Sequence, residues 1–243
     1  TTTGGNNVAV GRETLKTNTI GSHNVAIGSN ALDALTTSSA NIAIGTNSLT
    51  TNTTGANNIA IGYDALSSNE TGGNSVAVGR DALKNSTVSN NVAVGYRALD
   101  ASTTGNKNVG IGNDALGQNT TAENGVAVGY QALAANTTGS RNSALGAYAL
   151  TTNTTGVNNV AVGQGALNDN TTASFNTAVG WATLTNNTTG TQNTAVGANA
   201  LDANTTASNN AALGYNALGA NTTGTKNVAV GADSLRSNTA HNN

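Results

Sequence analysis

The sequence predicts an all-β fold, a parallel β-solenoid of fourteen coils of about 17 residues each, and three observations support this prediction. An aliphatic residue followed by glycine recurs through the 243 residues at spacings of 17, with a single spacing of 16. A leucine lies four residues after each of these glycines. The residues before each glycine alternate with the two-residue period of a β-strand. Internal repetition of this kind is typical of solenoids.

Each repeat is numbered here from its glycine, which takes position 0. The fourteen glycines are Gly11, Gly28, Gly45, Gly62, Gly79, Gly95, Gly112, Gly129, Gly146, Gly163, Gly180, Gly197, Gly214 and Gly231. Few aromatic and charged residues, 3% and 8%, would also suit a disordered tract. Position +4 is nevertheless always Leu and position −1 always Val, Ile or Leu, which a disordered chain has no reason to maintain. We therefore favour the solenoid.

The first element of each repeat is a short strand that ends just before the glycine, as at 8–10, 25–27 and 92–94. Positions −3 and −1 then point to one side of the strand and position −2 to the other. Because −3 and −1 are mostly large and aliphatic, we expect them to form the core with Leu at +4. Glycine permits a sharp bend into a second short strand that carries this leucine.

The Asn-Thr-Thr-Gly stretch at +7 to +10 supplies the turn that closes the coil, because Asn and Gly tolerate positive φ. In the 16-residue repeat we expect the missing residue to lie between Leu83 and Asn85. Since a register slip would turn every side chain to the wrong face, the strands on both sides should stay in register.

Small residues at position −2 form a column that we expect to lie outside, opposite the core. A strand face in water is normally polar, so this alanine stripe predicts close contact with another chain. Alternatively, alanine merely fits a tight bend. The predicted subunit interface comprises Ala60, Ala77, Ala93, Ala127, Ala144, Ala161, Ala178 and Ala195.

Several classes of function are excluded by composition. The absence of cysteine excludes disulfides, thiol catalysis and Cys-based zinc sites. A net charge of −2 does not fit a nucleic-acid binder. No apolar run approaches the ~18 residues that span a membrane. His23 and His241 have no nucleophile and carboxylate beside them, so we expect no catalysis and no cofactor.

Five acidic residues fall at position +2: Glu13, Asp64, Asp81, Asp114 and Asp233. Asp64 and Asp81 lie on successive coils and could share Ca²⁺, whose ligands are oxygens. Because no recognised calcium loop is present, we expect no metal, with the two carboxylates turned to water near Arg80 and Arg97.

Aromatic residues recur at position +1 and are candidate ligand contacts: Tyr63, Tyr96, Tyr130, Trp181 and Tyr215. Exposed rings at a regular spacing can stack on sugars or contact a receptor. The alternative is that each ring covers a neighbouring glycine turn.

Asn-x-Thr sequons are possible glycosylation sites: Asn52, Asn69, Asn85, Asn119, Asn136, Asn153, Asn170, Asn187, Asn204 and Asn221. Turn formation explains the same residues without sugars.

Units such as Asn24-Val25-Ala26-Ile27-Gly28 and Asn58-Ile59-Ala60-Ile61-Gly62 resemble the head repeats of trimeric autotransporter adhesins. The longer string Asn-x-Ala-Val-Gly-Tyr-x-Ala-Leu-x-x-Asn-Thr-Thr-Gly also resembles repeats of bacterial and phage tail-fibre-domain proteins. The resemblance covers nearly the whole chain and implies a left-handed roll, three chains around one axis and an extracellular adhesive or spacer role. The repeat here is longer than the usual adhesin unit.

We therefore expect a single repeat array over 1–243, part of a longer chain or a stacked fibre, on a cell surface or virion. Its expected partners are copies of itself, as a homotrimer or fibre, and a glycan or matrix protein. The main alternatives are a phage tail-fibre shaft or receptor-binding segment, and an ice-binding solenoid with Thr at +8 and +9. The adjacent threonines should diverge, which disfavours ice binding.

Overall fold

The computed structural model describes residues 3–238 and 240–242, and all regular secondary structure in them is β-strand. Two compact units divide the chain, Thr1–Glu123 and Asn124–Asn243. The first unit contains β1 (Val8–Val10), β2 (Val25–Ile27), β3 (Ile42–Ile44), β4 (Ile59–Ile61), β5 (Val76–Val78), β6 (Val92–Val94) and β7 (Val109–Ile111). The second contains β8 (Val126–Val128), β9 (Ser143–Leu145), β10 (Val160–Val162), β11 (Thr177–Val179), β12 (Thr194–Val196), β13 (Ala211–Leu213) and β14 (Val228–Val230).

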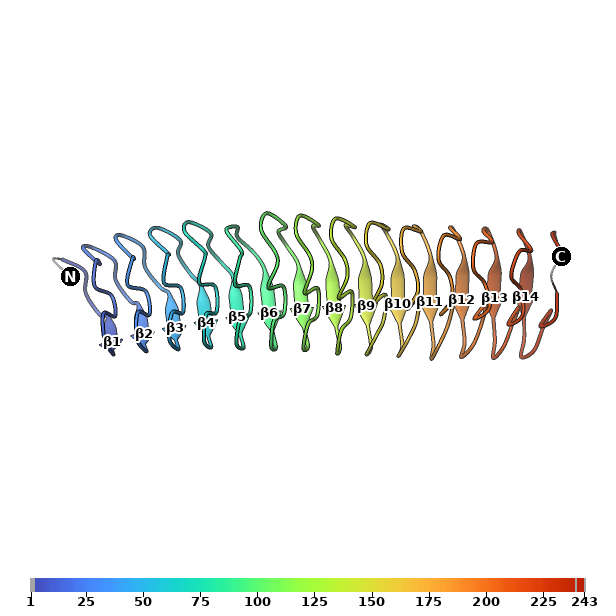
Figure 1. Ribbon diagram of the computed structural model, residues 1–243, viewed down its shortest axis with the longest axis horizontal. Helices are drawn as coiled ribbons and strands as arrows, with labels where there is room; N and C mark the ends of the chain where they lie inside the picture. Colours follow the sequence, from blue (N-terminus) through green and yellow to red (C-terminus); the bar gives the residue numbers. More distant parts are fainter. Residues whose placement is uncertain (1–2, 239, 243) are drawn as a thin grey trace. The chain divides into compact units, whose positions relative to one another are not determined.

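Within each unit, every strand pairs in parallel with the strand of the next repeat (Figure 1). The register places equal repeat positions opposite each other, such as Val25 against Ile42 and Thr177 against Thr194. Backbone hydrogen bonds continue between coils outside the strands, as from Leu49 N to Ala65 O at 3.0 Å. The predicted all-β parallel solenoid, with one coil per repeat, is confirmed.

The 16-residue repeat keeps its neighbours in register, as predicted: Val76, Ala77 and Val78 pair with Val92, Ala93 and Val94. The predicted place of the missing residue, between Leu83 and Asn85, is wrong. Ser86 N donates to Leu83 O at 3.1 Å, the bond that Asn69 N makes to Leu66 O in the preceding coil. The missing position is therefore +9, between Thr87 and Val88. The turn after leucine needs its full length for this bond, whereas the exposed threonine turn can shorten.

The predicted core comprised positions −3, −1 and +4, and only +4 is confirmed. Thirteen of the fourteen leucines at +4 are buried, including Leu99, Leu116 and Leu133, and Leu235 is exposed. The strands, however, face the other way from the prediction. Alanines at −2 are buried in β2–β6 and β8–β14, whereas no side chain at −3 or −1 is buried. The small residues line the interior and the large aliphatic ones face outward.

Gly110, the single glycine at position −2, shows why alanine belongs inside. A Cβ built on it would lie 3.2 Å from Leu99 Cγ and 3.1 Å from Ala115 O. The strand therefore faces the leucine and the +3 residue across the coil, and only a methyl group fits. Small residues do mark a close approach of backbone, but the approaching backbone is the far side of the same coil. The predicted subunit interface on Ala60, Ala77, Ala93, Ala127, Ala144, Ala161, Ala178 and Ala195 is wrong, because these residues are at most 1% exposed.

The predicted second strand does not form, because the residues after each glycine lie in turns. Every leucine at +4 has φ between 47° and 54°, the left-handed region that side chains normally avoid. Burying leucine outweighs the roughly 1–2 kcal/mol that this backbone costs. Glycine at position 0 is required for close stacking: a Cβ on Gly146 would lie 2.6 Å from the carbonyl carbon of Gly163.

Two columns of asparagine complete the interior. At position −4, Asn176 N donates to Asn159 Oδ1 at 2.9 Å, and its own Nδ2 donates to Gly190 O at 2.8 Å. At position +7, Asn52 Nδ2 donates to Gly55 O at 3.1 Å, while its Oδ1 accepts from Gly55 N at 2.8 Å. These amides satisfy the turn backbone, which lets polar groups lie in the core.

Candidate functional site

The outward side of the first unit's sheet is covered entirely by β-branched aliphatic side chains. We call it the aliphatic face; it consists of Val8, Val10, Val25, Ile27, Ile42, Ile44, Ile59, Ile61, Val76, Val78, Val92, Val94, Val109 and Ile111. All of these side chains are half-buried or exposed. A sheet face in water normally carries polar residues, and extensive apolar patches mark interaction surfaces.

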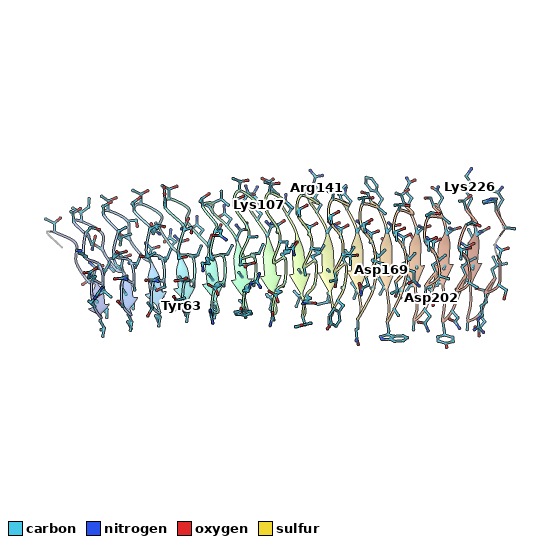
Figure 2. The ribbon with its side chains drawn as sticks, viewed as in Figure 1. Tyr63, Lys107, Arg141, Asp169, Asp202 and Lys226 are labelled. Atoms are coloured by element: carbon cyan, nitrogen blue, oxygen red, sulfur yellow. The ribbon has the colours of Figure 1, made fainter. Side chains whose placement is uncertain are left out.

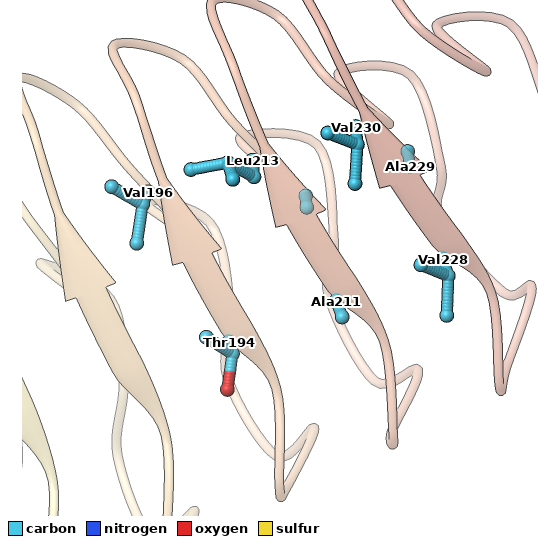
Figure 3. A pocket seen from close by; sticks show the side chains of 8 residues that line it. Thr194, Val196, Ala211, Leu213, Val228, Ala229 and Val230 are labelled. Atoms are coloured by element: carbon cyan, nitrogen blue, oxygen red, sulfur yellow. The ribbon is translucent and has the colours of Figure 1, made fainter.

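The corresponding face of the second unit carries both polar and aliphatic side chains. Position −3 there is Ser143, Thr177, Thr194 or Ala211 in four of seven strands, while position −1 stays aliphatic. An open hollow of about 170 Å³ lies on β12–β14, lined mainly by valine, leucine and alanine (Figure 3). It forms where Ala211 replaces a larger residue between Thr194 and Val228. The aliphatic character of this surface is therefore strongest in the first unit.

The five predicted aromatic contacts are all exposed at position +1, between 43% for Tyr96 and 57% for Trp181. We call this column the aromatic edge. The structure adds two exposed rings that the sequence analysis missed, Tyr148 and Phe175, at positions +2 and −5. Tyr148 packs edge-on against Tyr130, with 5.3 Å between ring centroids. Tyr148 could have been found from the sequence, since position +2 lies next to the +1 column of aromatic residues.

Tyr63 and Tyr96 lie on either side of Arg80 in the +1 column of three successive coils. The guanidinium carbon of Arg80 is 5.7 Å from the Tyr63 ring centroid and 5.9 Å from that of Tyr96. Both distances fall in the range of cation–π contacts. Arg80 Nε also lies 3.2 Å from Asp81 Oδ2. These two rings are therefore engaged with an arginine of the chain itself.

Asp64 and Asp81 are bridged by Lys84, whose Nζ lies 3.1 Å from Asp64 Oδ2 and 3.0 Å from Asp81 Oδ1. The hydrogen bond to Asp81, followed by that to Asp64, raises the pKa of Lys84 above its ordinary value. The ammonium group thus takes the place between the carboxylates where the calcium alternative would put an ion. Within 3–238 and 240–242, no group of three or more His, Asp or Glu residues is arranged to hold a metal.

Three partly buried aspartates lie at position +5, and two of them have raised pKa values. Burial raises the pKa of Asp100, against the lowering effect of the hydrogen bond from Arg97 Nε at 3.0 Å. Burial likewise raises the pKa of Asp202. His23 and His241 are exposed; His23 Nε2 lies 3.2 Å from Asn6 Nδ2, and His241 Nδ1 accepts from Thr225 N at 2.9 Å.

Nine of the ten predicted glycosylation sites are unavailable in the folded chain. The following asparagines are at most 1% exposed: Asn52, Asn69, Asn119, Asn136, Asn153, Asn170, Asn187, Asn204 and Asn221. They form the +7 column of the core, so glycosylation of the folded chain at these residues is ruled out. Asn85 is exposed, because Ser86 takes the buried position in the short repeat.

The two threonines of each turn diverge, as predicted. At +8 the hydroxyl donates to a backbone carbonyl of the next coil, as from Thr154 Oγ1 to Thr171 O at 3.1 Å. At +9 the side chains are exposed. Most coils expose only the +9 threonine, although Thr103 and Thr222 at +8 are exposed beside their neighbours, so a continuous two-row hydroxyl surface does not form.

No protein-family model matches this chain, and comparison with curated proteins gave no match. Among the residues that the structure describes, no helix is long and apolar enough to cross a membrane.

Proposed function

We propose that this chain is a structural segment of an extracellular fibre, in which copies associate side by side through the aliphatic face. The observation that supports the proposal is this face itself: seven adjacent strands, each with two outward Val or Ile residues and no polar residue between them. Association removes this surface from water, which is the main favourable term in assembly. The resemblance to adhesin head repeats favours three chains around a common axis.

The proposed role is adhesive or spacer rather than catalytic. In this arrangement the aliphatic face lies inside the assembly, and the aromatic edge stays available to a glycan or matrix partner. The alanine column takes no part in association, since it fills the interior of each coil.

The test is the mass of the full chain in solution. Threonine replaces Ile42, Ile44, Ile59 and Ile61 together, because threonine is also β-branched and already occupies position −3 in β11 and β12. Light scattering should show a multimer, with a trimer expected, for the unchanged chain and a monomer for the variant. Far-UV circular dichroism checks that the variant folds.

The matched control replaces exposed Thr37, Thr54, Thr71 and Thr104 with alanine, four changes outside the aliphatic face. It should associate as the unchanged chain does. An unchanged chain that is monomeric at tens of micromolar would overturn the proposal. Normal association of the variant with threonine in place of Ile42, Ile44, Ile59 and Ile61 would overturn it as well.

A further inference from the structure

In the second unit, Trp181 and Tyr215 occupy the aromatic edge two coils apart, with Ala198 between them. Their side chains are 57% and 54% exposed. Two strand spacings separate equivalent positions by about 9.6 Å. Because Ala198 ends at Cβ, no larger +1 side chain lies between the two aromatic residues.

The first unit contains the same arrangement with an occupant, the guanidinium of Arg80 between Tyr63 and Tyr96. The backbone register of the two places is equivalent. Asp81 N donates to Tyr63 O at 2.9 Å and Arg97 N to Arg80 O at 3.0 Å. In the second unit, Asn199 N donates to Trp181 O and Asn216 N to Ala198 O, both at 3.0 Å. The spacing that accepts a guanidinium in the first unit is thus repeated in the second.

The charge of the surrounding turns favours a cation. Asp202 lies in the same turn as Ala198, four residues later, and Asp169 lies in the turn of the coil before Trp181. Arg141 and Lys226 lie at the upper edge of the second unit, away from these two aspartates (Figure 2). Arg236, in the coil after Tyr215, is 3.7 Å from Asp233, and its charge also acts on Asp202.

We propose that Trp181, Ala198 and Tyr215 form a slot that binds the guanidinium group of an arginine side chain on a partner protein. The two aromatic faces contact the planar cation from both sides, as in the Tyr63–Arg80–Tyr96 stack, and Asp202 contributes to the negative potential. A planar, delocalised cation stacks on rings better than a lysine ammonium, which selects arginine over lysine.

The fluorescence of Trp181 provides the assay, since it is the single tryptophan of the chain. The full chain is titrated with N-acetyl-arginine amide and, at equal ionic strength, with N-acetyl-lysine amide. We expect a saturable change in emission with the arginine compound and affinity weaker by about threefold or more with the lysine compound. Tyr215→Ala should weaken arginine binding by about threefold or more, because one aromatic face is lost.

In Ala198→Arg, the new side chain should occupy the slot. The Trp181 emission of this variant should differ from that of the unchanged chain and should no longer respond to added arginine amide. Tyr130→Ala, in the same column but outside the slot, is the matched control and should bind normally. Circular dichroism checks the fold of each variant.

Three results would overturn the proposal: no saturable response to arginine amide, equal responses to arginine and lysine amides, or unchanged binding in folded Tyr215→Ala. Saturation by methyl galactoside in place of arginine amide would identify a sugar site instead and also overturn it. The slot lies outside the aliphatic face, so its failure in fluorescence and the failure of self-association in light scattering are separate outcomes.

Discussion

Replacement of Ala161 by valine tests which side of the strand faces the interior. Ala161 is fully buried in β10. At the equivalent position of β7, a Cβ built on Gly110 would lie 3.2 Å from Leu99 Cγ, so two further methyl groups have no space. Overpacking of this kind costs about 1–3 kcal/mol. A loss of about 2 kcal/mol lowers Tm by about 4–8 °C in a chain of this size.

The control is Val160→Ala, one residue earlier, where the side chain is 37% exposed. Alanine is already present at this position in β13, as Ala211. We expect Val160→Ala to cost less than about 1 kcal/mol, because only part of the valine surface is buried.

Thermal and urea unfolding, followed by circular dichroism at one low protein concentration, measure both variants. If valine faced inward and alanine outward, Val160→Ala would be the more damaging change and Ala161→Val nearly neutral. That reversed order would refute the assignment of the interior.

Three further predictions concern single residues. Gly110→Ala should stabilise the chain by about 1 kcal/mol in urea unfolding, because the other repeats carry alanine there and glycine costs strand entropy; a loss of stability would contradict this. Asn153→Ala should cost about 2–4 kcal/mol, since its amide bonds Asn136, Gly156 and Asn170 within the core, whereas Thr155→Ala, at the exposed +9 position, should be nearly neutral. Asp202→Asn should be more stable at pH 7: burial raises the folded pKa of Asp202, so its ionisation opposes folding above that pKa. This difference in stability should shrink as pH falls through the raised pKa toward the ordinary value of 3.8, and a constant difference across that range would contradict the assignment.

The sequence was sufficient to predict the solenoid, because the repeat length and the strand alternation each depend on local pattern. It was not sufficient to predict the interior. Alternation separates position −2 from −3 and −1, but it does not say which side faces inward. The prediction placed the larger side chains inside, because the hydrophobic effect alone favours burial of the larger apolar surface. The width of the coil decided otherwise, and Gly110 against Leu99 is the contact that reveals it.

The turn geometry was also missed, although a signal was present. Positions −5 and +2 have positive φ in every repeat described, as at Asn57 and Asp64. Asn and Asp are enriched at these positions, and both tolerate this backbone. Because a positive φ does not fit an extended strand, this enrichment at +2 could have excluded the second strand after the glycine. The contact of Arg80 with Tyr63 and Tyr96 required the stacking of coils in space, because the three residues are 16 or 17 positions apart.

The near-identity of successive coils has a consequence for folding. Since equal positions stack on each other, a chain that skips one whole repeat recovers almost every backbone bond and is a low-energy misfolded state. The first unit carries features that make such a slip costly: one 16-residue repeat, and Leu35, Ser86 and Ser102 in the asparagine column at +7. The second unit has 17-residue repeats with asparagine at +7 throughout. Slipped registers should therefore compete more strongly with native pairing in the second unit and slow its refolding.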